Sequence, residues 1–148
     1  GYADAQYSLG LCYDYGNGVT KNMQEAVKWY TSAAELGNIE AQYNLGVCYY
    51  NGDGVPKNRH EAIKWWTKSA ERGSTVSQFN LGVSYSLGEG VPQNFIYAYM
   101  WFNIAASNET DEYLKREYIE KRNVTEKLMT PMQIQEAQRL AREWKPKK

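Results

Sequence analysis

The sequence predicts an all-α fold: an α/α superhelical solenoid of three 36-residue helix-turn-helix repeats followed by C-terminal capping helices. Three observations predict it. The chain aligns with itself at a period of 36 residues in three consecutive copies, without a gap. Apolar residues recur at helical spacing in both halves of each copy. After residue 108 the period stops, yet two further helical patterns continue toward the C-terminus.

A Leu-Gly pair and a glycine loop fix the register of the copies. The pairs are Leu9-Gly10, Leu45-Gly46 and Leu81-Gly82, and the loops are Gly16-Asn17-Gly18, Gly52-Asp53-Gly54 and Gly88-Glu89-Gly90. The predicted repeats span 1–36, 37–72 and 73–108, and the predicted C-terminal helical cap spans 109–148. No strand pattern precedes the loops and no phosphate or calcium fingerprint is complete, so we expect them to be tight turns.

Each copy is expected to form two antiparallel helices, helix A and then helix B. In the first copy Ala5, Leu9 and Tyr13 recur at helical spacing and predict a core-facing stripe on helix A. Helix B is expected to begin after Asn22, which with Glu25 resembles a capping box. A single pair of helices cannot bury both apolar stripes, so the copies must stack on one another.

Glycines mark the ends of the B helices, and aromatic residues recur inside them. Gly37 and Gly73 are expected to adopt left-handed conformations that end helix B. The aromatic columns are Trp29, Trp65 and Trp101, followed one position later by Tyr30, Trp66 and Phe102. Because the tryptophans recur in register on the core stripe, we interpret them as packing residues rather than as a platform for sugars or bases.

The segment after residue 108 is expected to cover the third repeat. The third helix B carries Phe95, Ile96, Tyr97, Tyr99, Met100 and Ile104 at positions that are mostly polar in the first. A helix that is apolar all round should be buried all round. We expect a charged helix from Asn108 to Met129, and a last helix from Pro131 to about Trp144 that Thr130 caps.

These motifs resemble the Sel-1-like repeat over 108 of the 148 residues. The shared pattern is Ala-x3-Leu-Gly-x2-Tyr-x2-Gly-x-Gly-Val, then Ala-x2-Trp-aromatic-x2-Ala-Ala and a closing Gly. The tetratricopeptide repeat is similar, but its period is about 34 residues, and Gln6, Gln42 and Gln78 stand where it has Trp. The resemblance implies an adaptor or scaffold function. The closing segment after Thr130 is similar to that of many bacterial members, so a bacterial source is expected.

Charge and composition exclude several classes of function. Seventeen basic residues balance seventeen acidic ones, and no basic stripe is present, so we expect no nucleic-acid partner. No apolar run approaches the roughly 20 residues of a membrane helix, so no membrane insertion is expected. His60 is expected to be solvated, and Cys12 and Cys48 to be free, although a disulfide between them stays possible in principle. We predict no catalytic residue, no metal and no cofactor.

The remaining feature is a second face on each helix A, which we call the A face. On a helical wheel it lies well away from the core stripe, and stacked helical hairpins place helix A on their concave side. Its residues are Asp4, Tyr7, Leu11, Asp14, Glu40, Tyr43, Val47, Tyr50, Val76, Phe79 and Val83, with Ser86 at the end. The face is interpreted either as a site for a protein or peptide segment or as packing between repeats.

We therefore predict a non-enzymatic protein–protein interaction module, an adaptor or scaffold. One alternative is a hydrolase acting on cell-wall or β-lactam substrates, which has been suggested for relatives, but no nucleophile–base pair supports it here. Another is a self-assembling structural repeat protein. We expect a monomer that can self-associate through its N-terminal end. The chain starts inside a repeat and resembles an excerpt, so neither partner nor localisation is predicted.

Overall fold

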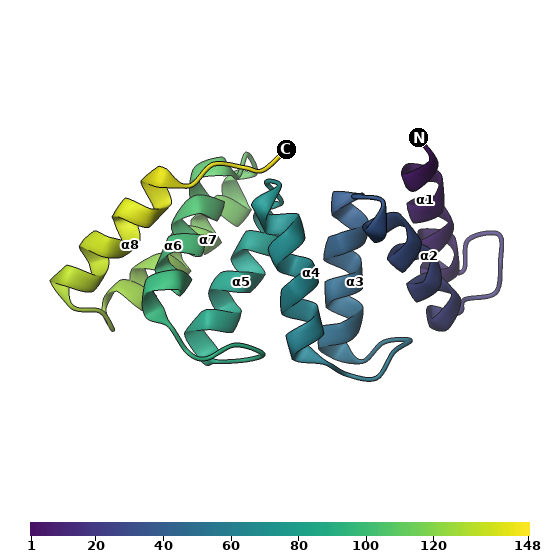
Figure 1. The fold of residues 1–148 in the computed structure, drawn as a ribbon, viewed down its shortest axis with the longest axis horizontal. Coiled ribbons are helices and arrows are strands. Elements are labelled where there is room, and N and C mark those ends of the chain that lie inside the picture. Colours follow the sequence, from purple (N-terminus) through teal and green to yellow (C-terminus); the bar gives the residue numbers. More distant parts are fainter. The chain divides into compact units, whose positions relative to one another are not determined.

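The structure is a computed structural model that describes all 148 residues, and the prediction of an all-α fold is confirmed. The helices are α1 (Tyr2–Tyr15), α2 (Met23–Glu35), α3 (Ile39–Asn51), α4 (Arg59–Glu71), α5 (Thr75–Leu87), α6 (Phe95–Asn108), α7 (Glu112–Glu126) and α8 (Pro131–Glu143). The A helices are α1, α3 and α5, and the B helices are α2, α4 and α6. Figure 1 shows the glycine loop that joins the two helices of each repeat.

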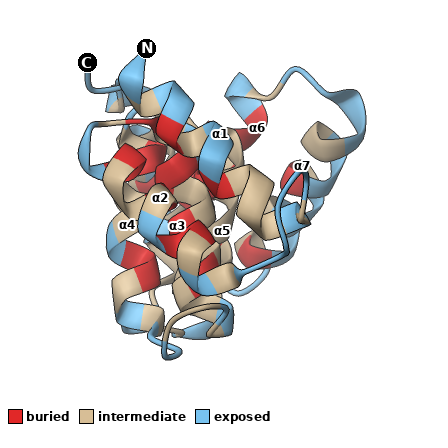
Figure 2. Ribbon diagram, turned by 90° about the vertical axis from the view of Figure 1, so that its right-hand side faces the viewer, coloured by how far each residue is buried: buried red, intermediate tan, exposed pale blue.

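Two compact units divide the chain, Gly1–Ser69 and Ala70–Lys148. The first holds α1 to α3 and most of α4, and the second holds α5 to α8. Within the units buried residues concentrate on the sides of helices that meet a neighbour, as on α2 and α3 in Figure 2, whereas the loops are largely exposed.

The glycine loops close in the same way three times. In the first, Gly16 has a φ of 73° and its N–H donates to the carbonyl oxygen of Cys12. The N–H of Asn22 then donates to the carbonyl oxygen of Tyr13 over 2.9 Å, which returns the chain to the end of helix A. The equivalent bonds run from Asn58 to Tyr49 and from Asn94 to Tyr85. These loops are turns that satisfy their own backbone groups, as predicted.

The B helices begin at an asparagine, but the predicted capping box is only half present. The Asn22 side chain accepts a hydrogen bond from the N–H of Glu25 over 3.2 Å. The Glu25 carboxylate does not return to the Asn22 backbone and instead accepts from Lys28 Nζ at 2.8 Å. Glu61 likewise pairs with Lys64, at 3.5 Å. The reciprocal half of the prediction was wrong because an exposed carboxylate has a cation one turn away.

Close contact between the two helices of a repeat depends on the glycine of the Leu-Gly pair. A Cβ atom at Gly10 would lie 2.5 Å from the ring of Tyr30, and one at Gly82 would lie 2.5 Å from the ring of Phe102. Gly46 meets the Trp66 ring in the same way. Only a residue without a side chain permits so close an approach.

The two aromatic columns of the B helices are not buried equally. Tyr30, Trp66 and Phe102 are between 0% and 4% exposed, so this column forms the core. Trp29 and Trp65 are only half-buried, which corrects the prediction that the tryptophan column lies on the core stripe. Trp101 alone in that column is buried, where the ring of Trp144 meets it edge-on at 6.2 Å.

The core stripe of the first A helix is also more open than predicted. Leu9 is 42% exposed, whereas Leu45 is fully buried in a cluster with Ala33 and Ala34 of α2. The preceding B helix therefore supplies the cover for Leu45. No helix of the first unit covers Leu9 in this way. The same position of the repeat is therefore exposed in α1 and buried in α3.

The segment after residue 108 packs on the third repeat, within the second unit. The rings of Phe79 in α5 and Tyr118 in α7 stack at 4.7 Å, and Gln138 in α8 donates to the Tyr99 hydroxyl over 3.4 Å. Most of α6 is buried as expected, but Tyr97 stays 42% exposed and only leans on Tyr85.

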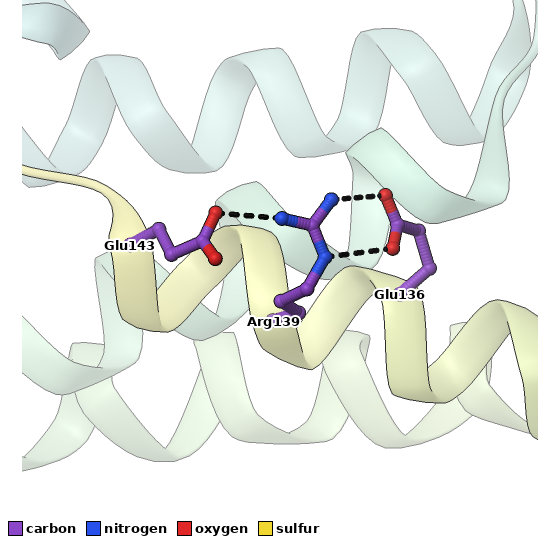
Figure 3. A network of polar contacts seen from close by, with 3 residues as sticks. All are labelled: Glu136, Arg139 and Glu143. Atoms are coloured by element: carbon purple, nitrogen blue, oxygen red, sulfur yellow. Dashed lines mark hydrogen bonds and ion pairs between the residues drawn. The ribbon is translucent and has the colours of Figure 1, made fainter.

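The boundaries of the last two helices depend on side-chain caps. The predicted charged helix begins later than expected, at Glu112, because α6 continues through Asn108 and the Asp111 carboxylate caps α7. The helix α8 runs from Pro131 to Glu143 with the predicted capping box of Thr130 and Gln133. On its outer surface Arg139 bridges Glu136 and Glu143, at 2.6 Å and 2.7 Å (Figure 3).

Candidate protein-binding face

The A face of the first repeat is tied into its surroundings by hydrogen bonds at both ends. The exposed Asp4 carboxylate pairs with the N-terminal amine at 3.0 Å and accepts from Asn38 Nδ2 of the next repeat at 2.9 Å. These contacts lower the pKa of the Asp4 carboxyl, the amine contributing most. Between the ends, Tyr7 and Leu11 are half-buried against the core of the first unit.

A buried tyrosine lies beneath this part of the A face. The hydroxyl of Tyr30 donates to the Asp14 carboxylate over 2.7 Å, while the Tyr7 ring leans on the Tyr30 ring at 5.9 Å. Burial, and then the neighbouring Asp14 carboxylate, raise the pKa of the Tyr30 hydroxyl. The hydroxyl therefore stays protonated and continues to donate to Asp14. Asn44 of the second repeat donates to the Tyr7 hydroxyl at 3.4 Å.

The A face of the second repeat is more open. Glu40 is exposed, and Tyr43 and Val47 are half-buried. Tyr50 tilts against the buried Trp66 at 5.3 Å, and the Arg59 guanidinium lies 5.0 Å from the centre of the Tyr50 ring. The result is an aromatic and aliphatic surface whose edges carry one acidic and one basic group.

In the third repeat α7 approaches the A face. Val76 is half-buried, and the Phe79 ring is enclosed between Phe102 at 5.6 Å and Tyr118 at 4.7 Å. Val83 lines a cavity of about 250 Å³ between α5, α6 and α7. Here the A face is partly occupied by packing and partly opens into this cavity.

Sequence reasoning missed the contribution of α7 to this site. Lys121, Val124 and Leu128 line the same cavity as Val83, yet this helix was expected only to cover the third repeat. The signal is a pair of apolar residues four positions apart, Val124 near the end of α7 and Leu128 in the turn that follows it. Their position against α5 depends on tertiary packing.

The candidate chemical groups outside the A face are dispersed. No group of three or more His, Cys, Asp or Glu side chains is gathered as metal ligands would be. His60 is exposed, and both cysteines are free, as predicted. Cys48 is buried, and burial, followed by the charges of Asp14 and Asp53, raises the pKa of its thiol to about 12. No helix has the length and apolar character needed to span a bilayer.

The family model of the Sel1 repeat matches residues 3–38, 39–74 and 75–109, together more than half of the chain. In each match an A helix and a B helix follow in the same order. The matched segments begin two residues later than the repeats predicted from self-comparison. The prediction of 109–148 as a separate cap is not tested by this match and stays a prediction.

Two solved structures share the fold. A Sel1 repeat protein from Oxalobacter formigenes is 39% identical with a TM-score of 0.70, covering 72% of this chain and 43% of that chain. The protein c5321, a protective antigen of uropathogenic Escherichia coli strains displaying an SLR fold, is 31% identical with a TM-score of 0.66, covering 96% of this chain and 37% of that one.

A curated relative matches a shorter stretch. DAP3-binding cell death enhancer 1 from Rattus norvegicus is 45% identical over 38 residues, 26% of this chain and 8% of that protein. This chain thus spans less than half the length of each of these relatives. Because they come from a mammal as well as from bacteria, the expected bacterial source stays a prediction.

The 36-residue period, the helix pairs with their glycine loops and the three consecutive matches agree. The chain belongs to the Sel1 repeat family, with the α/α solenoid fold class of that family.

Proposed function

We propose that this chain is a non-enzymatic interaction module that holds a segment of a partner protein on its A face. Sel1 repeat proteins are generally protein–protein interaction modules, and typically non-enzymatic scaffolds. One observation carries the choice of face. None of the eleven predicted A-face residues is buried, whereas Leu45 and Leu81 on the core stripe are at most 1% exposed. The contrast is clearest in α3, because Leu9 on the core stripe of α1 is itself 42% exposed and Tyr118 of α7 covers Phe79 of α5.

The composition of the A face suits a protein ligand better than a small charged one. Tyrosine offers a large apolar surface with few rotatable bonds, so it loses little entropy when a partner covers it. Tyr7, Tyr43 and Tyr50 are half-buried, and neighbouring groups therefore already restrict their rings. Pre-ordered aromatic anchors commonly provide most of the binding energy of an interface. The acids Asp4 and Glu40 lie at the edge, where charge contributes more to specificity than to affinity.

The name of the rat relative describes a protein that binds DAP3. The similarity covers only 38 residues, about one repeat, and so supports a role in binding a protein without naming the partner of this chain.

A pair of variants tests the proposal. Leu45→Ala removes a fully buried side chain and should lower the free energy of unfolding by about 2–5 kcal/mol. Tyr43→Ala combined with Val47→Ser changes only half-buried side chains and should cost far less. The double variant should nevertheless lose capture of partners from a cell lysate while its far-UV circular dichroism stays that of the parent.

The matched control is Lys64→Ala, on the exposed side of α4. It should capture the same partners as the parent. If the Tyr43 and Val47 double variant unfolds as readily as Leu45→Ala, the A face is packing between repeats, and the proposal fails.

A second proposal, self-association, is favoured by an apolar side chain that α1 leaves in contact with solvent. Gln42 and Gln78 donate from Nε2 to the carbonyl oxygens of Ala34 and Ala70, each over 3.1 Å. Gln6, at the equivalent position of α1, is also buried, but Leu9 one turn further along is 42% exposed. Light scattering over a concentration series tests this proposal: the apparent mass should rise with concentration for the parent and stay monomeric for Leu9→Glu.

A further inference from the structure

The cavity beside Val83 has the size of a site for one side chain. Its volume is about 250 Å³, and it lies within the second unit between α5, α6 and α7. A buried cavity of about 150 Å³ accommodates benzene, whereas pockets for drug-sized ligands begin at about 300 Å³. The cavity can therefore take a leucine, methionine or phenylalanine side chain, but not an extended ligand.

The walls of the cavity are apolar, and its surroundings are exposed. Phe102 forms part of the lining and is only 1% exposed, so the cavity reaches the core of the unit. Leu87, Val124 and Leu128 line the same space and are 61%, 58% and 61% exposed. Three large apolar side chains thus lie in water around one opening, an arrangement that marks interaction sites.

Among the polar groups that line the cavity, only the Lys121 ammonium group is left to pair with a charged ligand. The hydroxyl of Ser86 donates to the carbonyl oxygen of Val83, and that of Thr125 donates to the carbonyl oxygen of Lys121, each over 2.8 Å. Both hydroxyl protons are therefore used inside their own helices. Lys121 is the only ionisable residue of the lining, and its ammonium group forms no ion pair in the structure. A ligand that fills the cavity would be favoured by a carboxylate beside its apolar group.

We propose that this cavity binds a partner peptide that inserts one bulky apolar side chain and places the carboxylate of a neighbouring Asp or Glu on Lys121. The inference rests on the proposed interaction function and deepens it by assigning partner chemistry to the A face of the third repeat, which shares Val83 with the cavity. Apolar burial supplies the affinity, and Lys121 selects the acidic neighbour. Lys121, Val124 and Leu128 lie outside the three matched repeats, so this specificity does not follow from the repeat pattern.

Selection from a library of displayed random peptides on the purified full chain tests the proposal. The enriched peptides should carry Leu, Met or Phe within about two positions of an Asp or Glu. The affinity of a fluorescein-labelled enriched peptide should fall at least about tenfold for Lys121→Glu. A second selection on Lys121→Glu should enrich Lys or Arg in place of the acid. Val124→Asp, which charges the apolar wall, should lose binding of both peptide sets.

The matched control is Arg116→Glu, which makes the same charge change at an exposed position of α7 that does not line the cavity. It should bind the first peptide as the parent does. Thermal melting of all three variants checks that they fold.

Three results would overturn the inference. Peptides that bind the parent and Lys121→Glu equally place the peptide site elsewhere, and the interaction function then stands without this cavity. Enrichment of no peptide at all removes the cavity as a peptide site, while the proposed function is still judged by the Tyr43 and Val47 variants. Binding of hexanoate, a short aliphatic carboxylate, with no binding of peptides would make the cavity a site for small carboxylates.

Discussion

At the residue scale, the fold rests on a glycine placed against an aromatic ring three times. The contacts are Gly10 with Tyr30, Gly46 with Trp66, and Gly82 with Phe102. The aromatic residue of this contact differs between the repeats, and so does the A-face residue that lies next to it. Asp14 accepts from the Tyr30 hydroxyl, whereas Trp66, whose indole N–H reaches a backbone carbonyl, has the Tyr50 ring as its neighbour. The A face thus differs between repeats partly because the core beneath it differs.

The first prediction concerns Gly46→Ala. Helix propensity alone would favour alanine in a helix interior by about 1 kcal/mol. Because the new Cβ would overlap the Trp66 ring, we expect destabilisation of about 1–3 kcal/mol instead. Urea unfolding followed by tryptophan fluorescence measures the sign. Ser8→Ala on an exposed part of α1 is the control, and a Gly46→Ala variant more stable than the parent would contradict the close contact.

The second prediction concerns the two thiols. With its pKa raised to about 12, Cys48 at pH 8 carries only about one thiolate in ten thousand molecules, and it is also buried. A thiol reagent should therefore modify the half-buried Cys12 in the native protein and both cysteines after unfolding in denaturant. Reducing agent should leave the melting temperature unchanged. Cys48→Ala should lower only the denatured count, and equal rates for both native thiols would be inconsistent with this account.

At the scale of elements, the sequence predicted the helices well and their caps less well. The asparagine caps and the Thr130 capping box follow from local residue types, and the structure has them. Residue types alone do not predict whether the Glu25 carboxylate bonds to the backbone of Asn22 or to Lys28. Exposed contacts of this kind differ by only tenths of a kcal/mol. The tryptophan column was misplaced by one position, since neighbouring aromatic residues in a helix give the same periodic signal.

The third prediction concerns the last two helices. Truncation after Asn108 removes three contacts with the third repeat. They are the ring contact of Trp144 with Trp101, the hydrogen bond from Gln138 to Tyr99, and the stacking of Tyr118 on Phe79. The apolar surface of α6 would then meet water, so we expect aggregation or loss of cooperative thermal melting. Truncation after Trp144 is the control. It removes the exposed tail, with one ion pair and one backbone hydrogen bond from Lys147 to Glu71, and should change the melting temperature far less than the shorter truncation. A monomeric shorter truncation that melts like the parent would refute the covering role.

At the scale of the whole molecule, the repeat period predicted the family and the fold class, because a period with fixed glycines and aromatics admits few architectures. It also identified the A face as a second face. The repeat period could not predict which residues of the A face are exposed to solvent and which are packed against another helix. Phe79 is enclosed because α7, which lies outside the repeats, places Tyr118 against it. The cavity with Lys121 arises from the same helix and has no counterpart in the repeat pattern.

The central claim is that a partner protein lies on the A face, and site-specific photocrosslinking tests it most directly. The photoreactive amino acid p-benzoylphenylalanine is placed at the position of Tyr43 on the A face, or at that of Trp65 on α4, both half-buried aromatic positions. After irradiation in a lysate, mass spectrometry should find the same captured partner joined to the chain at position 43 and not at position 65. A partner that is joined at position 65 and never at position 43 would contradict the account.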